Sequence, residues 1–264
     1  MSLLRGNITV SRLTWDVVRQ VNGIEEQHHI LHVPTPQVSL ADVPALQRDA
    51  FAELEKIGWA RGTNVDPELL GVIRMLAAPP LELHGWVSRP NRPTLSAVAA
   101  SGPGGAILAF ADETDIHVRP IRPDDLAVSI VSLMPPLRPG RGQSVSIPWD
   151  VYRELIENGA YHESGSGGFL EQNTQRTRLE RDADVLLALL KQPRLGGGRI
   201  YGAARPKLGR KRKTEFPVTY LDNESGRWLL KHKPSSNGDV WAVATPATPD
   251  LLVTELTDLL TTVS

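Results

Sequence analysis

The histidines of the run His28-His29-Ile30-Leu31-His32 form the densest group of potential metal ligands in the chain. As an extended segment, this run places His28 and His32 on one face and His29 on the other. The spacing is not that of the helical HExxH zinc motif, and no Cys or Asp stands beside it. We therefore expect an extended surface segment here rather than a metal site.

Motifs that bind phosphate or build a nucleophile are missing from the sequence. Glycine-rich stretches occur at 102–105, 165–168 and 196–198, but no Gly-Lys-Ser/Thr follows them and none has dinucleotide-binding spacing. There is no GxSxG elbow, and the acidic residues at 112–115 have the composition of a hairpin turn. We expect no catalytic, cofactor-binding or metal residues, and therefore a protein that is not an enzyme.

The strongest charge feature is a basic run without an acidic residue. Its cations are Arg194, Arg199, Arg205, Lys207, Arg210, Lys211, Arg212 and Lys213. One interpretation is a nucleic-acid-binding regulator that uses residues 205–213. The other is a solvated hairpin tip between two strands, with Gly209 at the turn. We favour the hairpin and expect no nucleic-acid partner, because no aromatic residue interrupts the tip and the net charge is −1.

Composition describes an ordinary folded protein. Of 264 residues, 41% are apolar and 22% are charged, which is typical of a globular chain with a real core. The chain has no cysteine, which excludes disulfide scaffolds and cysteine nucleophiles and suits a reducing compartment. We see neither a secretory signal nor an apolar run long enough for a membrane span. We expect a cytoplasmic protein without membrane contact.

Helices and antiparallel strands are expected in the first half of the chain. A strand at 8–11 precedes a helix that carries Trp15, and further helices run over 40–57 and from Asp66-Pro67 to Pro79. Alternation predicts strands at 81–87, 94–100, 106–112 and 115–119, before a helix that opens at Pro123. The turns between these strands are too short for parallel crossovers, so the strands must be antiparallel.

The second half of the chain repeats this order of elements. The pattern Trp-Asp-Val-x-Arg is shared by 15–19 and 149–153, and a helix ending at Pro193 matches the one ending at Pro79. Strands at 199–204, 218–222, 227–232 and 240–244, then a helix opening at Pro249, complete the match. The shared order indicates a duplication, with halves at 1–134 and 143–264 joined by a linker over 135–142.

The duplication predicts an α+β fold with a central twisted antiparallel sheet flanked by helical bundles. The two halves would be pseudo-two-fold related within a single domain over 1–264. Two separate domains joined at 135–142 are the alternative. We favour a shared sheet, because short strands leave edges that require covering.

An ordered set of short segments resembles the EspG family of type VII (ESX) secretion-associated proteins in actinobacteria. The similarity runs over nearly the whole chain, and no single segment is a catalytic signature. The segments that carry it are Leu31-His32-Val33-Pro34, Val65-Asp66-Pro67-Glu68-Leu69-Leu70, Met75-Leu76-Ala77-Ala78-Pro79, Leu221-Asp222-Asn223-Glu224-Ser225-Gly226-Arg227-Trp228 and Trp241-Ala242-Val243-Ala244-Thr245-Pro246-Ala247.

The resemblance implies a cytosolic chaperone that binds PE–PPE-type heterodimers and keeps them soluble for export. In the family, the helical tip of the PPE subunit docks in a groove between the sheet and the C-terminal bundle. A loop between strands contributes to that groove. By position this loop is 88–93 here, which makes Arg89, Asn91 and Arg92 candidate contacts.

Apolar residues of the second half are the remaining candidates for the groove: Trp228, Leu230, Leu252, Leu256 and Leu259. Each has an alternative role in ordinary core packing. An apolar groove with a polar rim suits a helical tip that would otherwise aggregate in water. An exposed groove or sheet edge would also suit a homodimer of the unliganded chaperone. The Gly165–Gln175 loop has no assigned role.

Overall fold

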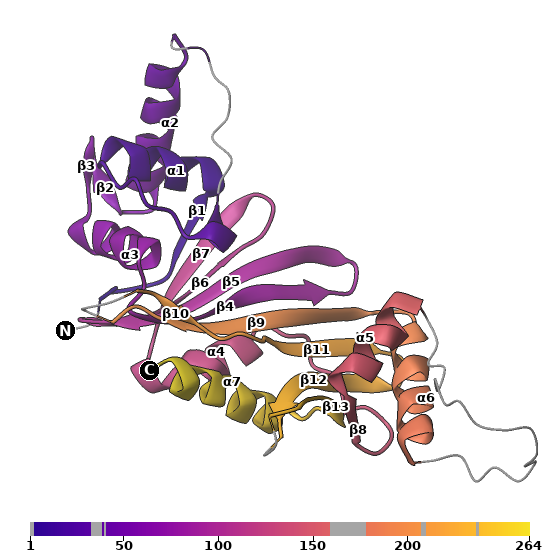
Figure 1. The fold of residues 1–264 in the computed structure, drawn as a ribbon. Coiled ribbons are helices and arrows are strands. Elements are labelled where there is room, and N and C mark those ends of the chain that lie inside the picture. The colour runs from indigo at the N-terminus through magenta and orange to yellow at the C-terminus, as the bar shows by residue number, and fades with distance from the viewer. Residues whose placement is uncertain (1–2, 33–38, 40, 159–177, 207–209, 236–237) are drawn as a thin grey trace, which may run out of the picture. The chain divides into compact units, whose positions relative to one another are not determined.

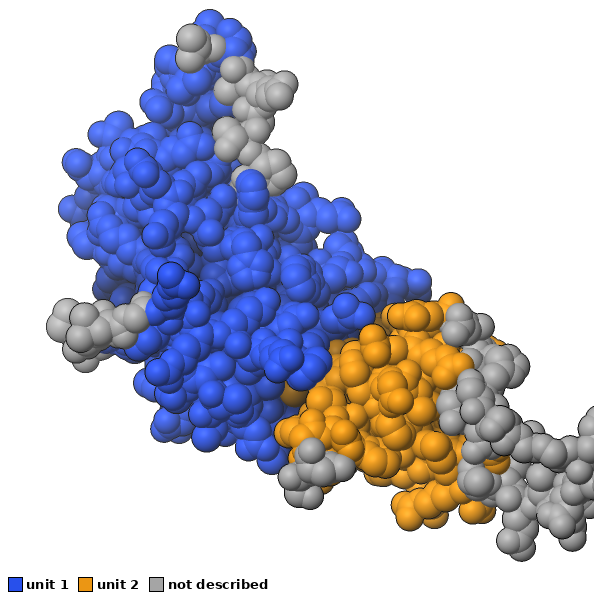
Figure 2. Space-filling view, in the orientation of Figure 1, with its two compact units in different colours: residues 1–135, 198–217, 249–264 blue, residues 136–197, 218–248 orange. Residues whose placement is uncertain are grey.

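The computed structural model describes residues 3–32, 39, 41–158, 178–206, 210–235 and 238–264, so the Gly165–Gln175 loop lies outside it. The chain forms two compact units (Figure 2). Unit 1 comprises residues 1–135, 198–217 and 249–264, and unit 2 comprises residues 136–197 and 218–248. Both units combine helices with antiparallel strands, which confirms the α+β class. None of the described helices is both long and apolar enough to span a membrane.

Unit 1 is built on strands in the order β1-β7-β6-β5-β4-β9, with β10 paired to β9. These strands are β1 (Ile8–Ser11), β4 (Leu81–Arg89), β5 (Arg92–Gly102), β6 (Gly105–Ala111), β7 (Asp115–Ile121), β9 (Gly196–Ala204, of which the first two residues belong to unit 2) and β10 (Arg212–Lys213). A separate hairpin of β2 (Ala60–Arg61) and β3 (Asn64–Val65) was not predicted from the sequence.

Helices cover both faces of the unit 1 sheet (Figure 1). One face carries α1 (Arg12–Val21), η1 (His29–Leu31), α2 (Val43–Lys56) and α3 (Pro67–Ala77). The other carries η2 (Pro123–Asp125), α4 (Leu126–Val131) and α7 (Pro249–Val263). Residues Ala97 to Ala100 of β5 are 0% exposed, as expected for a strand enclosed between two helical layers. Small alanine side chains let both layers approach the sheet closely.

Helix starts in unit 1 follow the sequence signals. Asp66 caps α3 by accepting a hydrogen bond from the backbone N–H of Glu68, and Pro67 takes the first turn, as predicted. The Asp66 carboxylate also pairs with Arg5 at 2.6 Å. Burial raises the pKa of Asp66, but the bonds from Arg5 and Glu68 outweigh it and hold the pKa below its usual value.

Replacing Asp66 with alanine is expected to lower the free energy of unfolding by about 1–2 kcal/mol at neutral pH. Because the folded-state pKa is depressed, the carboxylate contributes stability above about pH 4 and loses it as the pH falls further. Urea unfolding at pH 7 and pH 3 measures the difference. Asp42→Ala is the matched control, because Asp42 precedes α2 without a side-chain capping bond. Equal losses in the two variants would contradict this account.

Unit 2 contains the strand order β11-β12-β13-β8. Its elements are β8 (Val145–Pro148), α5 (Trp149–Asn158), α6 (Arg178–Lys191), β11 (Val218–Asn223), β12 (Gly226–Pro234) and β13 (Val240–Pro246). Gly197, at the start of β9, lies against Tyr220 of β11. The core is formed where Leu186 and Leu189 of α6 and Leu155 of α5 meet the sheet.

The segment predicted as a free linker is bonded into unit 2. The backbone N–H of Gly140 donates to Arg227 O at 2.7 Å, and that of Arg141 donates to Ser225 O at 3.0 Å. Pro139 also forms an isolated parallel bridge with Arg227. Pro and Gly here allow an extended segment to lie against β12, and the first boundary between the units falls after Pro135, at the start of the predicted linker.

Candidate functional site

The predicted loop residues Arg89, Asn91 and Arg92 meet in the turn between β4 and β5. Arg89 pairs with Arg92 across this hairpin, after an irregularity in register. Asn91 has a φ of 53°, a left-handed conformation that asparagine tolerates in turns. Asn91 and Arg92 are exposed, while Arg89 is half-buried and donates from Nη2 to Pro93 O at 3.2 Å. The structure thus gathers these three residues on one accessible tip.

Trp86 lies on β4 next to this tip and was missed from the sequence. It is 40% exposed, which is unusual for so large an apolar side chain. Glu82, His84 and Trp86 occupy alternate positions of β4, so their side chains lie on the same face of the strand. Because Glu82 and His84 are polar, the sequence could have indicated a polar environment for Trp86. An exposed tryptophan beside arginines is typical of the centres of protein–protein interfaces. We call Trp86, Arg89, Asn91 and Arg92 the hairpin surface.

The predicted apolar contacts pack inside the units. Trp228 and Leu230 are buried in the unit 2 core. Leu252 and Leu256 of α7 are 0% exposed in unit 1. Leu259 is half-buried, and its backbone lies close to Gly202 of β9. These residues therefore support the surfaces above them, and their direct contact with a partner stays a prediction.

A cluster of histidines surrounds a buried carboxylate in unit 1. His28 Nε2 lies 2.8 Å from Glu82 Oε2, and His84 Nδ1 lies 3.3 Å from Glu82 Oε1. His28, Glu82 and His84 are buried at 4%, 0% and 0% exposure. The ring of His29 stacks on His28 with centroids 4.7 Å apart, and lies 5.0 Å from the ring of His84. We call these four residues the histidine cluster.

This arrangement corrects the interpretation of residues 28–32 as an extended surface segment. Residues His29–Leu31 form a 3-10 helix, and the His28 side chain accepts a 3.4 Å hydrogen bond from Ile30 N at its start. Two histidines that alternation would place on opposite faces therefore lie side by side. The sequence could not show that Glu82 and His84 of β4 complete the cluster.

The net effect of burial and neighbouring groups is to lower the pKa values of three residues in the histidine cluster: Glu82, His84 and His29. Burial raises the pKa of Glu82, but its bonds with His28 and His84 outweigh burial and hold that pKa well below the usual range. Burial, with help from the charges of His28 and Lys211, lowers the pKa of His84, although its contacts with Glu82 act in the opposite direction. Burial and the neighbouring charges lower the pKa of His29 to about 4. At neutral pH, Glu82 is ionised while His84 and His29 keep a free lone pair.

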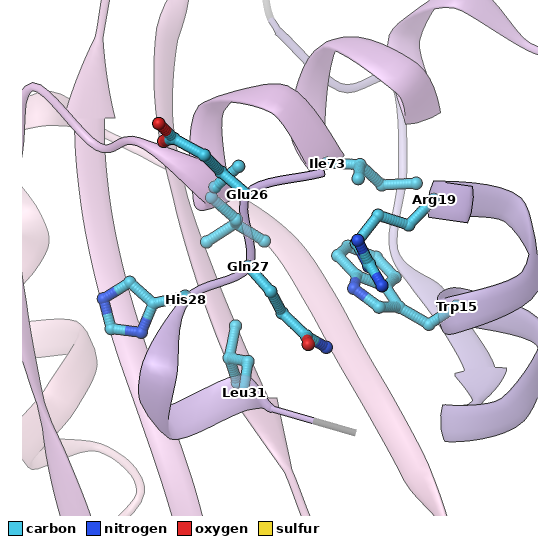
Figure 3. Close-up of a pocket in the computed structure, with 9 residues that line it drawn as sticks. Trp15, Arg19, Glu26, Gln27, His28, Leu31 and Ile73 are labelled. Carbon is cyan, nitrogen blue, oxygen red and sulfur yellow. The ribbon is translucent and has the colours of Figure 1, made fainter. Parts of the chain in front are cut away.

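A small pocket lies beside His28 (Figure 3). Figure 3 shows His28 at one wall and Trp15 and Arg19 at the opposite wall, with Gln27 and Leu31 between them. The space open to solvent-sized molecules is about 10 Å³, which is room for one water. The pocket therefore does not suit a small-molecule substrate.

The basic segment after β9 lies against unit 1 rather than standing free. Lys211 Nζ is 2.6 Å from Glu82 Oε1, and Lys213 Nζ lies 4.1 Å from the centre of the Tyr201 ring. Arg212 and Lys213 form β10, which pairs with the end of β9 as the predicted hairpin requires. Lys207 and Gly209 lie outside the described residues.

Comparison of the sequence with models of known protein families shows which family the chain belongs to. The model of the EspG family matches residues 11–258. The chain belongs to the EspG family. No curated protein sequence matches it closely enough to indicate a nearer relative.

A solved EspG structure has the same fold. It is that of the Mycobacterium tuberculosis type VII secretion system chaperone EspG5 in complex with the PE25–PPE41 dimer. The TM-score is 0.69 at 17% sequence identity, and the match covers 98% of this chain and 97% of that chain. The EspG resemblance read from the sequence and its α+β fold are therefore confirmed.

The segment Leu221–Trp228, which carries part of the EspG resemblance, forms most of the β11–β12 hairpin. Asp222 and Arg227 form a buried ion pair across the β11–β12 hairpin, at 2.7 Å. Trp228 Nε1 donates to Ser225 Oγ at 3.0 Å, and the indole ring covers Gly140. These contacts join the β11–β12 hairpin to Gly140 within unit 2.

Proposed function

We propose that this chain is a cytoplasmic chaperone of a type VII (ESX) secretion system. It binds a PE–PPE-type heterodimer through the PPE subunit, keeps the pair soluble for export and catalyses no reaction. Membership of the EspG family over residues 11–258 carries this proposal. The solved complex of EspG5 with the PE25–PPE41 dimer supports the class of partner.

The hairpin surface is the part of unit 1 that we assign to the partner. Trp86 offers apolar area, and Arg89 and Arg92 offer guanidinium groups that can bond the carbonyls and carboxylates at a helix tip. The buried residues Leu252 and Leu256 hold α7 in place without reaching the surface. A partner with an exposed apolar helical tip would gain most from covering Trp86.

Co-expression with PE–PPE pairs tests the proposal. The chain should keep a cognate pair soluble and co-purify with it as a complex of one copy of each subunit. Candidate pairs are those encoded near the gene for this chain. Insolubility of every such pair in the presence of the chain would refute the function.

Replacing Trp86 with alanine is expected to weaken binding of the PE–PPE pair by about 30-fold or more, equivalent to about 2 kcal/mol. The reason is the loss of a large aromatic anchor at the centre of the hairpin surface. Isothermal titration calorimetry or biolayer interferometry with the purified pair measures the change.

Ile57→Ala is the matched control for Trp86→Ala. Ile57 is 39% exposed, close to the 40% of Trp86, but follows α2 and lies outside the hairpin surface. The control should bind like the unmodified chain. Similar affinity of both variants would exclude the hairpin surface while leaving the chaperone function in place.

A further inference from the structure

The histidine cluster contains donor atoms suited to a transition metal. One ring nitrogen each from His28 and His84 and one carboxylate oxygen from Glu82 all lie within 4.8 Å of one another. His28 caps η1, and Glu82 and His84 occupy alternate positions of β4. Two imidazoles and a carboxylate form the donor set of many zinc sites.

We propose that His28, Glu82 and His84 bind a divalent transition metal ion of the Zn²⁺ class. Ligand atoms around a tetrahedral Zn²⁺ lie about 3.4 Å apart, because each is about 2.1 Å from the metal. Ligand atoms that are now up to 4.8 Å apart would therefore close by up to roughly 1.4 Å, through rotation of the His28 and His84 side chains. The exposed ring of His29 borders the fourth position.

Unsatisfied polarity in the cluster favours a metal over the metal-free arrangement. Nε2 of the buried His84 has no hydrogen-bond partner among the described residues, and Nδ1 has only a long 3.3 Å contact with Glu82 Oε1. A buried polar group with such poor partners destabilises a folded protein. Coordination of its Nδ1 would replace that long contact with a bond to the metal.

Lys211 is the cation that now neutralises Glu82. Its ammonium lies 2.6 Å from Glu82 Oε1, and the side chain is 31% exposed, so it has a path to solvent. A metal and an ammonium ion cannot share this carboxylate oxygen without strong repulsion. The metal must therefore displace the Lys211 side chain toward solvent, while β10 stays paired with β9.

Coordination requires one change at His28. The ring now accepts at Nδ1 from Ile30 N, which leaves its proton on Nε2 facing Glu82. A metal at Nε2 would move that proton to Nδ1 and cost the contact with Ile30. At 3.4 Å this contact is long for a hydrogen bond and therefore weak.

Metal titration of the purified chain tests the site without reference to a partner. After removal of bound metal with a chelator, Zn²⁺ should bind at one ion per chain, and Co²⁺ should give the visible absorption of a tetrahedral site. His84→Phe and Glu82→Gln should each lower the affinity for Zn²⁺ by about 100-fold or more, since each removes a ligand. His117→Gln, which changes a half-buried histidine 3.8 Å from Asp112, should bind Zn²⁺ like the unmodified chain.

Lys211→Met gives the sharper result, because it keeps every ligand and removes the competing cation. Zn²⁺ affinity should rise about tenfold or more, while Lys213→Met, whose lysine lies over Tyr201, should change it less than threefold. Urea unfolding checks that each variant is folded. Absence of a one-to-one site, unchanged affinity in His84→Phe, or no gain in Lys211→Met would each overturn the proposal.

Discussion

Replacing Arg227 with methionine is expected to lower the free energy of unfolding by about 3–5 kcal/mol. Asp222 and Arg227 are 1% and 3% exposed, and two hydrogen bonds of 2.7 Å join the guanidinium to the carboxylate. Methionine preserves the volume of the side chain but leaves the Asp222 charge buried without its cation. That uncompensated charge, rather than the loss of the pair itself, causes most of the expected destabilisation.

Two further variants separate the pair from a general effect of losing a charge. In Asp222→Leu/Arg227→Met both charges are gone, so most of the lost stability should return. Arg178→Met removes an arginine with a 90% exposed side chain, 4.0 Å from Asp182 on α6, and should cost less than about 0.5 kcal/mol. Urea unfolding followed by circular dichroism measures all three. A loss in Arg227→Met no larger than in Arg178→Met would disprove the account.

The Asp222–Arg227 pair also shows what local sequence can predict. The repeat of the first half predicted strands at 218–222 and 227–232, and β11 and β12 lie there. Gly226 adopts a φ of 121°, and a side chain there would collide with Pro139 O. The ion pair itself was not predicted, because charges on two sides of a turn are usually solvated.

The histidine cluster shows where sequence reasoning fails. His28 and Glu82 are separated by 54 residues along the chain, so no spacing rule connects them. The alternation at 81–87 predicted that Glu82 and His84 share a strand face, and they do. The sequence did not indicate which segment of the chain packs on that face of β4. A short histidine run can be strand or 3-10 helix, and its packing on Glu82 decides which.

The two compact units do not coincide with the two halves of the repeat. Strand order β1-β7-β6-β5-β4 in the first half corresponds to β8-β13-β12-β11-β9 in the second, which supports the proposed duplication. Yet α7 and most of β9, from the second half, belong to unit 1. Sequence matching detects the order of elements, whereas the units depend on which helix buries which sheet face. A duplicated order therefore does not predict two matching domains.

Replacing Gly85 with alanine is expected to destabilise unit 1 by about 3 kcal/mol or more, at the upper end of the cost of overpacking. A Cβ at this position of β4 would lie 1.9 Å from the backbone oxygen of Arg199 and 2.9 Å from the Cα of Ile200. Backbone atoms of a paired strand cannot rotate away as a side chain can, so β4 and β9 would have to separate. Thermal and urea unfolding measure the loss.

Gly71→Ala is a control with the opposite expected sign. Gly71 lies inside α3, and a Cβ there would meet only Leu3, at 3.9 Å. Alanine should therefore stabilise the chain by about 0.5–1 kcal/mol, the usual gain inside a helix. Gly85 also directly precedes Trp86, so strand separation in Gly85→Ala should weaken PE–PPE binding, whereas Gly71→Ala should leave it unchanged. A stable Gly85→Ala with full affinity would show that β4 and β9 tolerate separation and that the hairpin surface does not depend on their close approach.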